Sequence, residues 1–129
     1  MRVTIKEDKE KKGFFTVIPE GSIDSDTHDG FRDKIGPLLV KSTKNILLDL
    51  RHVDYISSAG LGVLFLVRKY MVENGGTLLF CNLKPQIKKL FEIVKALPKE
   101  SIFDSLEQAD KYFYHIMNEE IKKQRPIEE

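Results

Sequence analysis

The segment from Ile46 to Gly76 constrains the fold more than any other part of the chain. A short apolar run, Asn45–Leu50, predicts a buried strand. A polar turn follows, and the apolar segment from Ser58 to Asn74 then predicts a helix that ends at a Gly-Gly pair. A second buried strand is expected at Thr77–Cys81. Two buried strands joined by a helix predict a parallel βαβ unit with a right-handed connection.

The rest of the chain continues this alternation of strands and helices. Val3–Lys6 and Phe14–Ile18 have strand character, and the charged link between them, which ends in glycine, predicts a hairpin. The further elements expected are a helix capped by Asp26 or Thr27 that breaks near Gly36, a helix that starts at Pro85, an edge strand at Ser101–Phe103 and a last helix over about 105–123.

The element order that results is β-β-α-β-α-β-α-β-α, which predicts a single α/β domain with a mixed sheet over residues 1–123. Residues 124–129 have no apolar periodicity, and we expect them to fray. The last helix carries an apolar stripe that includes Ile116, Met117 and Ile121. A second copy of the chain could cover that stripe, so the sequence is compatible with a homodimer.

Composition limits the classes of function. The 129 residues carry a formal net charge of +1, and this balance argues against a nucleic-acid binder, which needs a clustered basic face. The lone Cys81 fits a reducing compartment. No apolar stretch is long enough to cross a bilayer or to form a signal peptide at the N-terminus. We therefore expect a cytoplasmic protein that does not associate with membranes.

The sequence offers little for catalysis. The three histidines lie far apart in unrelated contexts, and no pair of cysteines or histidines has the spacing of a metal site. Ser58 is not in the G-x-S-x-G motif of hydrolases, and a phosphate-binding loop of the G-x-x-x-x-G-K type is absent. We expect no enzymatic activity, no cofactor and no metal, although a nucleophilic Ser58 is the remaining enzymatic alternative.

Two serines, Ser57 and Ser58, fall where the central helix must begin. A serine at this place can cap the helix by accepting a hydrogen bond from an unpaired backbone N–H. It can also carry a phosphate, since a helix N-terminus favours negative charge. The pattern alone leaves both roles open. Asp24 follows the end of a predicted strand directly and could lie on the same rim as Ser58.

The helix after Ser58 has too many apolar residues for one core-facing side. It could pack between the sheet and a neighbouring element, or its N-terminal end could leave an apolar patch for a partner. Gly60 and Gly62 favour the patch in part, because they leave backbone uncovered and allow close approach. Each costs about 1 kcal/mol relative to alanine in a helix, so a compensating reason is expected.

These motifs together resemble a known family. V-D-Y-I-S-S-A-G-L-G-V-L, E-N-G-G-T-L-L-F-C-N-L and P-Q-I-K-K-L-F, with G-S-I-D upstream and I-F-D-S-L-E-Q-A downstream, are similar to the STAS domain of bacterial anti-sigma factor antagonists. The resemblance implies a mixed sheet with helices packed on one side. It also implies an anti-sigma factor antagonist, which binds an anti-sigma factor that is a serine kinase and so releases the sigma factor.

The resemblance assigns site residues as well. Ser58 matches the serine that the kinase phosphorylates to abolish binding, and a serine phosphatase resets the switch. The positions that the resemblance places at the partner surface are Asp24, Ser57, Gly60, Leu61 and Gly62. Leu61 could instead belong to the core. Ser57 stands where the family has aspartate, and Ala59 where it has serine or threonine. The alternative is a STAS domain that is not phosphorylated and serves as a scaffold or transport-accessory module.

Overall fold

The computed structural model describes residues 1–96, 114–115 and 118–123, and side chains in the first of these ranges through Val94. Its centre is a four-stranded sheet in the order β1-β2-β3-β4. The strands are β1 (Arg2–Glu7), β2 (Phe14–Glu20), β3 (Asn45–Asp49) and β4 (Thr77–Cys81). β1 runs antiparallel to β2, whereas β2, β3 and β4 are mutually parallel. The predicted hairpin and the predicted parallel βαβ unit are both confirmed.

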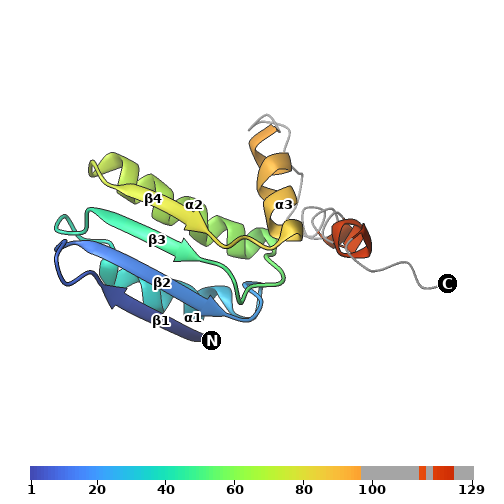
Figure 1. Ribbon diagram of the computed structural model, residues 1–129, viewed down its shortest axis with the longest axis horizontal. Helices are drawn as coiled ribbons and strands as arrows, with labels where there is room; N and C mark the ends of the chain where they lie inside the picture. Colours follow the sequence, from blue (N-terminus) through green and yellow to red (C-terminus); the bar gives the residue numbers. More distant parts are fainter. Residues whose placement is uncertain (97–113, 116–117, 124–129) are drawn as a thin grey trace.

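The helices are α1 (His28–Ile35), α2 (Ser58–Glu73) and α3 (Pro85–Ala96), and a 3-10 turn, η1 (Gly36–Leu38), follows α1 directly. Figure 1 shows α1 and α2 on the same side of the sheet, as expected. The predicted break near Gly36 is confirmed, because Pro37 sits in the 3-10 turn that ends α1. The predicted strand at Ser101–Phe103 lies outside the described residues.

The last predicted helix lies only partly within the described residues. Residues 114–115 and 118–123 are helical. Ile116 and Met117 fall outside the described part of the chain, so the homodimer and the limits of the domain stay predictions. Among the described residues, no helix is both long and apolar enough to cross a membrane.

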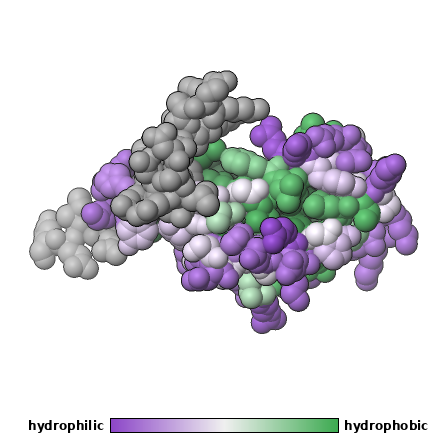
Figure 2. All heavy atoms as spheres, turned by 180° about the vertical axis from the view of Figure 1, so that it is seen from behind, coloured by the Kyte–Doolittle hydropathy of each residue, from purple (hydrophilic) through white to green (hydrophobic). Residues whose placement is uncertain are grey.

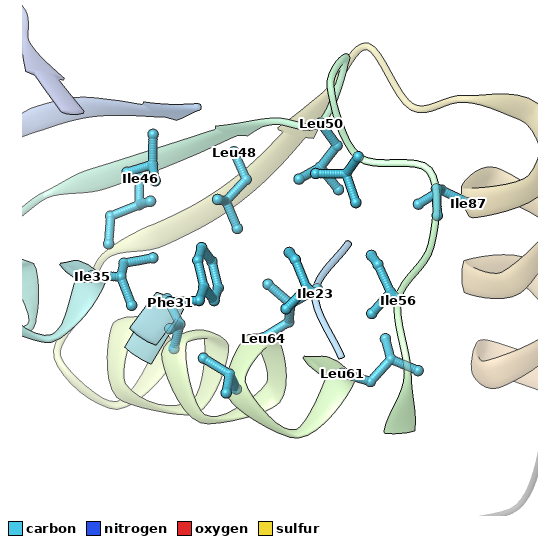
Figure 3. Close-up of a cluster of buried hydrophobic side chains, with 14 of the residues drawn as sticks. Ile23, Phe31, Ile35, Ile46, Leu48, Leu50, Ile56, Leu61, Leu64 and Ile87 are labelled. Carbon is cyan, nitrogen blue, oxygen red and sulfur yellow. The ribbon is translucent and has the colours of Figure 1, made fainter. Parts of the chain in front are cut away.

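The core fills the space between the sheet and its helices. β3 contributes Ile46 and Leu48 to it, both with no exposed surface, and α1 contributes Phe31 and Ile35. Figure 3 shows these side chains pointing toward one another, with Leu64 of α2 beside them. Because α1 and α2 both pack on this side of β3, the start of α2 is held in a fixed position relative to the strand ends.

The central helix ends as the sequence predicts. Asn74 is the C-cap of α2, and its backbone N–H donates to carbonyl oxygens of the last turn. Gly75 has φ +74°, a left-handed conformation that glycine adopts without steric cost. This stop lets the chain turn back into β4 and complete the parallel unit.

Candidate functional site

The start of α2 is built by two loops that lie side by side. The segment after β2 forms a parallel bridge with the loop between β3 and α2, through Ile23 and Ile56. The backbone N–H of Ile23 donates to the oxygen of Tyr55 (3.0 Å), and the N–H of Ser57 donates to the oxygen of Ile23 (2.9 Å). Both isoleucines are fully buried. This pairing fixes the chain immediately before Ser58.

The two serines have different positions in the helix. Ser57 is the N-cap, with extended backbone (φ −84°, ψ 175°), and its hydroxyl oxygen accepts a hydrogen bond from the N–H of Gly60 at 3.2 Å. Only 3% of Ser57 is exposed. Ser58 is the first residue of α2 and is half-buried. The structure therefore gives the cap to Ser57 and leaves Ser58 as the more accessible serine at the helix start.

Gly60 has a steric reason to be glycine. A Cβ added there would lie 2.3 Å from the backbone oxygen of Ile23, far inside normal contact. The helix start thus packs directly on the backbone of the segment after β2. Gly62 differs, because it is exposed and nothing lies within 4 Å of its added Cβ. The compensating reason expected for both glycines is therefore found for Gly60, whereas Gly62 leaves open surface.

Asp24 belongs to the turn that follows Ile23. One of its carboxylate oxygens accepts hydrogen bonds from the N–H of Asp26 (2.9 Å) and of Thr27 (3.1 Å). Its own N–H donates to the Thr27 hydroxyl oxygen at 2.9 Å. Because Ile23 is paired with the loop before α2, Asp24 lies close to the rim that carries Ser57 and Ser58. Its visible role is to hold this turn.

The expected cap of α1 is corrected by the same contacts. Thr27 is the N-cap residue by position, but its side chain makes no capping bond. Its hydroxyl instead donates to the oxygen of Ser22 at 2.6 Å. Asp26 makes no cap either, because α1 begins at His28 and Thr27 is the residue before it. The tight turn built by Asp24 takes these polar groups away from the helix end.

Leu61 lies in the core. It is 3% exposed and sits in the buried cluster next to Ile56, as Figure 3 shows. The arrangement corresponds to the core alternative, since this side chain is not available to a partner. Leu61 packs under the first turn of α2, in the buried cluster. Its predicted place at the partner surface is therefore replaced by a place in the core.

The outer face of α2 is mostly apolar instead. We use this name for the exposed residues Gly62, Phe65, Leu66, Lys69 and Val72, which recur at helical spacing. Phe65 is 49%, Leu66 48% and Val72 64% exposed. Figure 2 shows apolar residues gathered in a band across the helix-bearing side of the molecule. The sequence could not assign this face, because α2 is apolar nearly all round and periodicity alone does not say which side the sheet covers.

The loop before α2 is also tied to the elements that follow β4. Lys84 forms an ion pair with Asp54, and the amide of the buried Gln86 donates to the Asp54 backbone oxygen at 3.3 Å. At the start of the same loop, the buried carboxylate of Asp49 accepts hydrogen bonds from the Arg51 guanidinium, with the closest ion-pair contact at 2.8 Å. These contacts restrain the loop at several points along its length.

The Asp49 carboxylate has a lowered pKa. The hydrogen bond from Arg51 is the main cause, and the amide of Asn82, which donates at 3.1 Å, adds to it against the opposing effect of burial. Asp49 is therefore held ionised and acts as a structural link between the ends of β3 and β4. Among the described residues, no group of histidine, cysteine and carboxylate side chains could hold a metal ion.

Similarity to known proteins agrees with this geometry. Residues 6–109 match the family model of the STAS domain. The chain is 33% identical over 97 residues to BtrV of Bordetella bronchiseptica, which is named as a candidate anti-sigma factor antagonist; the match covers 75% of this chain and 84% of BtrV.

Two solved structures are similar in fold. One is the anti-sigma factor antagonist SpoIIAA of Bacillus in its unphosphorylated form, with a TM-score of 0.60 and 15% identity, covering 71% of this chain and 83% of SpoIIAA. The other is an anti-sigma factor antagonist from Mycobacterium paratuberculosis, with a TM-score of 0.59 and 20% identity, covering 88% of this chain and 93% of that one. At these identities the likeness shows the fold alone.

Proposed function

The chain belongs to the STAS domain family, and we propose that it is an anti-sigma factor antagonist switched by phosphorylation of Ser58. In this proposal it binds, in the cytoplasm, an anti-sigma factor that is also a serine kinase, and so releases the sigma factor. A serine phosphatase restores the active form. The protein acts by binding and not by catalysis.

The observation that carries the proposal is the division of roles between the two serines. The Ser57 hydroxyl is buried and engaged as the cap, so a kinase reaches Ser58 more readily. Serine and aspartate are both good N-caps, because each places an oxygen near the first backbone N–H groups. Ser57 can therefore replace the aspartate of the family pattern without loss of the helix start, which leaves Ser58 in the position of the phosphorylated serine.

The physical basis of the switch lies at the helix N-terminus. Phosphoserine carries about −1.5 to −2 charges at neutral pH. In the free protein the start of α2 stabilises negative charge by about 0.3–1 kcal/mol, so the modified protein still folds. In a tight interface the same charge loses its water without gaining a partner, which costs several kcal/mol. A loss of about 4 kcal/mol lowers affinity roughly a thousandfold.

The outer face of α2 is the proposed docking surface for the kinase. Gly62 lies one turn after Ser58 on the helix, and Phe65 and Leu66 lie about one turn further. The bare backbone of Gly62 allows close approach. Asp24 and Gly62 keep their proposed place at the partner surface. The roles of Ser57, Gly60 and Leu61 are to build the helix start that the partner meets.

Mass spectrometry of the intact protein after incubation with the cognate kinase tests this function. We expect one phosphate, located at Ser58 by peptide mapping. Ser58→Ala should prevent the modification, whereas the matched variant Ser57→Ala should still accept it at Ser58. A phosphate found on Ser57 and not on Ser58 would contradict the assignment. If the Ser58→Asp variant binds the partner as tightly as the parent chain does, the scaffold alternative is favoured.

A further inference from the structure

Tyr114 lies against the loop that carries the switch. The ring of Tyr114 lies 6.0 Å from the ring of Tyr55, edge to face, with 66° between the ring planes. Tyr55 precedes Ser58 by three residues in the loop between β3 and α2. The match to the STAS family ends at residue 109, so Tyr114 belongs to sequence beyond it. Figure 1 shows the helical turn of residues 118–123 at the same end of the molecule as this loop.

We infer that Tyr114 packs on the β3–α2 loop and limits the access of large partners to Ser58. The inference deepens the function proposed above and rests on it for the identity of the partner. Its structural part, the packing of Tyr114 on Tyr55 in the loop before Ser58, stands on the ring contact and can be tested without any kinase.

The size of a protein interface brings a partner that covers Ser58 into competition with Tyr114. A standard interface covers about 800 Å² on each partner, which corresponds to a disc roughly 16 Å in radius. Three residues of extended chain span at most about 11 Å. A partner on the outer face of α2 that also reaches the Ser58 side chain therefore comes within range of Tyr55. The partner and the Tyr114 ring cannot both cover the same part of Tyr55.

Hydrogen bonds and an ion pair hold the backbone around Tyr55 in place for this contact. Its backbone oxygen accepts the hydrogen bond from Ile23, and the adjacent Asp54 is held by Lys84 and Gln86. Tyr114 itself is 58% exposed, so only part of its ring is engaged. A single edge-to-face contact contributes little free energy, so a partner can displace Tyr114. The contact is still strong enough to slow the access of a large partner to Ser58. We therefore expect Tyr114 to act as a reversible cover that a partner displaces.

A thiol placed at the switch measures this access directly. In a Ser58→Cys chain, the rate of labelling by a bulky polyethylene-glycol maleimide reports how open the site is. Labelling by small iodoacetamide in parallel reports the intrinsic reactivity of the thiol. Peptide mapping separates position 58 from Cys81, which is half-buried and whose burial raises the pKa of its thiol.

Tyr114→Ala should raise the bulky-reagent rate about two- to tenfold, the range expected for loss of one aromatic contact, with the small-reagent rate unchanged. The matched Tyr114→Phe keeps the ring and should label like the parent. Since Tyr114 is largely exposed, both variants should melt like the parent. Equal bulky-reagent rates in all three chains overturn the inference. So does a rise in Tyr114→Phe as large as in Tyr114→Ala, because the ring contact would then not be the cause.

The kinase supplies a second readout on chains with Ser58 intact. Tyr114→Ala should be phosphorylated about two- to tenfold faster than Tyr114→Phe at a kinase concentration below saturation. Equal rates overturn the regulatory part of the inference. If no kinase modifies Ser58 in any variant, the proposed function fails, while the labelling rates still decide whether Tyr114 covers the site.

Discussion

Replacement of Gly60 by alanine should destabilise the fold, although alanine is the better helix former. The added Cβ would lie 2.3 Å from the backbone oxygen of Ile23 and 2.9 Å from its Cγ2. Ile23 is fully buried and paired with Ile56, so its backbone cannot move without breaking that bridge. Overpacking of this kind costs about 1–3 kcal/mol or more, against a gain of about 1 kcal/mol in helix propensity.

Gly62→Ala is the matched control on the same helix. It gains the same propensity, and its Cβ meets nothing within 4 Å. We therefore expect Gly62→Ala to be more stable than the parent by up to about 1 kcal/mol. Gly60→Ala should be less stable than Gly62→Ala by about 1–3 kcal/mol, because the propensity gain is common to both and the clash is not.

Urea unfolding followed by far-ultraviolet circular dichroism measures this difference as a shift in midpoint at constant slope. The reasoning requires the midpoint of Gly60→Ala to fall below that of Gly62→Ala. Equal midpoints would refute it, since they would mean that Ile23 yields freely and that the two loops are not locked together.

Three further predictions concern single residues near the switch. Ser57→Ala should lower the free energy of unfolding by about 1 kcal/mol through loss of the cap, measured by urea unfolding. Leu61→Ala should cost about 2–5 kcal/mol as a core truncation, and thermal melts beside titration calorimetry separate this loss from any change in binding. Arg51 lowers the pKa of Asp49, so the ionised Asp49 carboxylate stabilises the fold fully above the unfolded-state pKa near 3.8. This stabilisation is lost as the pH falls through the lower folded-state pKa. Asp49→Asn should therefore be less stable than the parent at pH 7, and the gap should shrink in acid unfolding experiments below about pH 3.8; a gap that stays constant with pH would contradict the ion pair.

Much of the fold could be predicted from the sequence because its signals are local. The apolar run of β3 and the glycine stop after Asn74 each act within a few residues, and both are where the sequence placed them. The break after Ile35 follows in the same way from Pro37, whose ring disfavours a continued α-helix.

The site was less predictable because its decisive contacts are not local. Ser57 and Ser58 are chemically identical, and only the backbone conformation at Ser57 decides which of them caps α2. The need for glycine at position 60 comes from Ile23, which is distant in sequence but adjacent in space. No periodic pattern links Tyr114 to Tyr55, because the two residues are distant in sequence and meet only in the folded chain.

The affinity of the chain for its kinase partner, with and without phosphate on Ser58, tests the central claim most directly. Titration calorimetry should compare the unmodified chain, the phosphorylated chain and phosphorylated chain treated with a phosphatase. The account predicts that phosphorylation weakens binding about a thousandfold and that phosphatase treatment restores it. Equal affinity of the unmodified and phosphorylated chains would contradict the account.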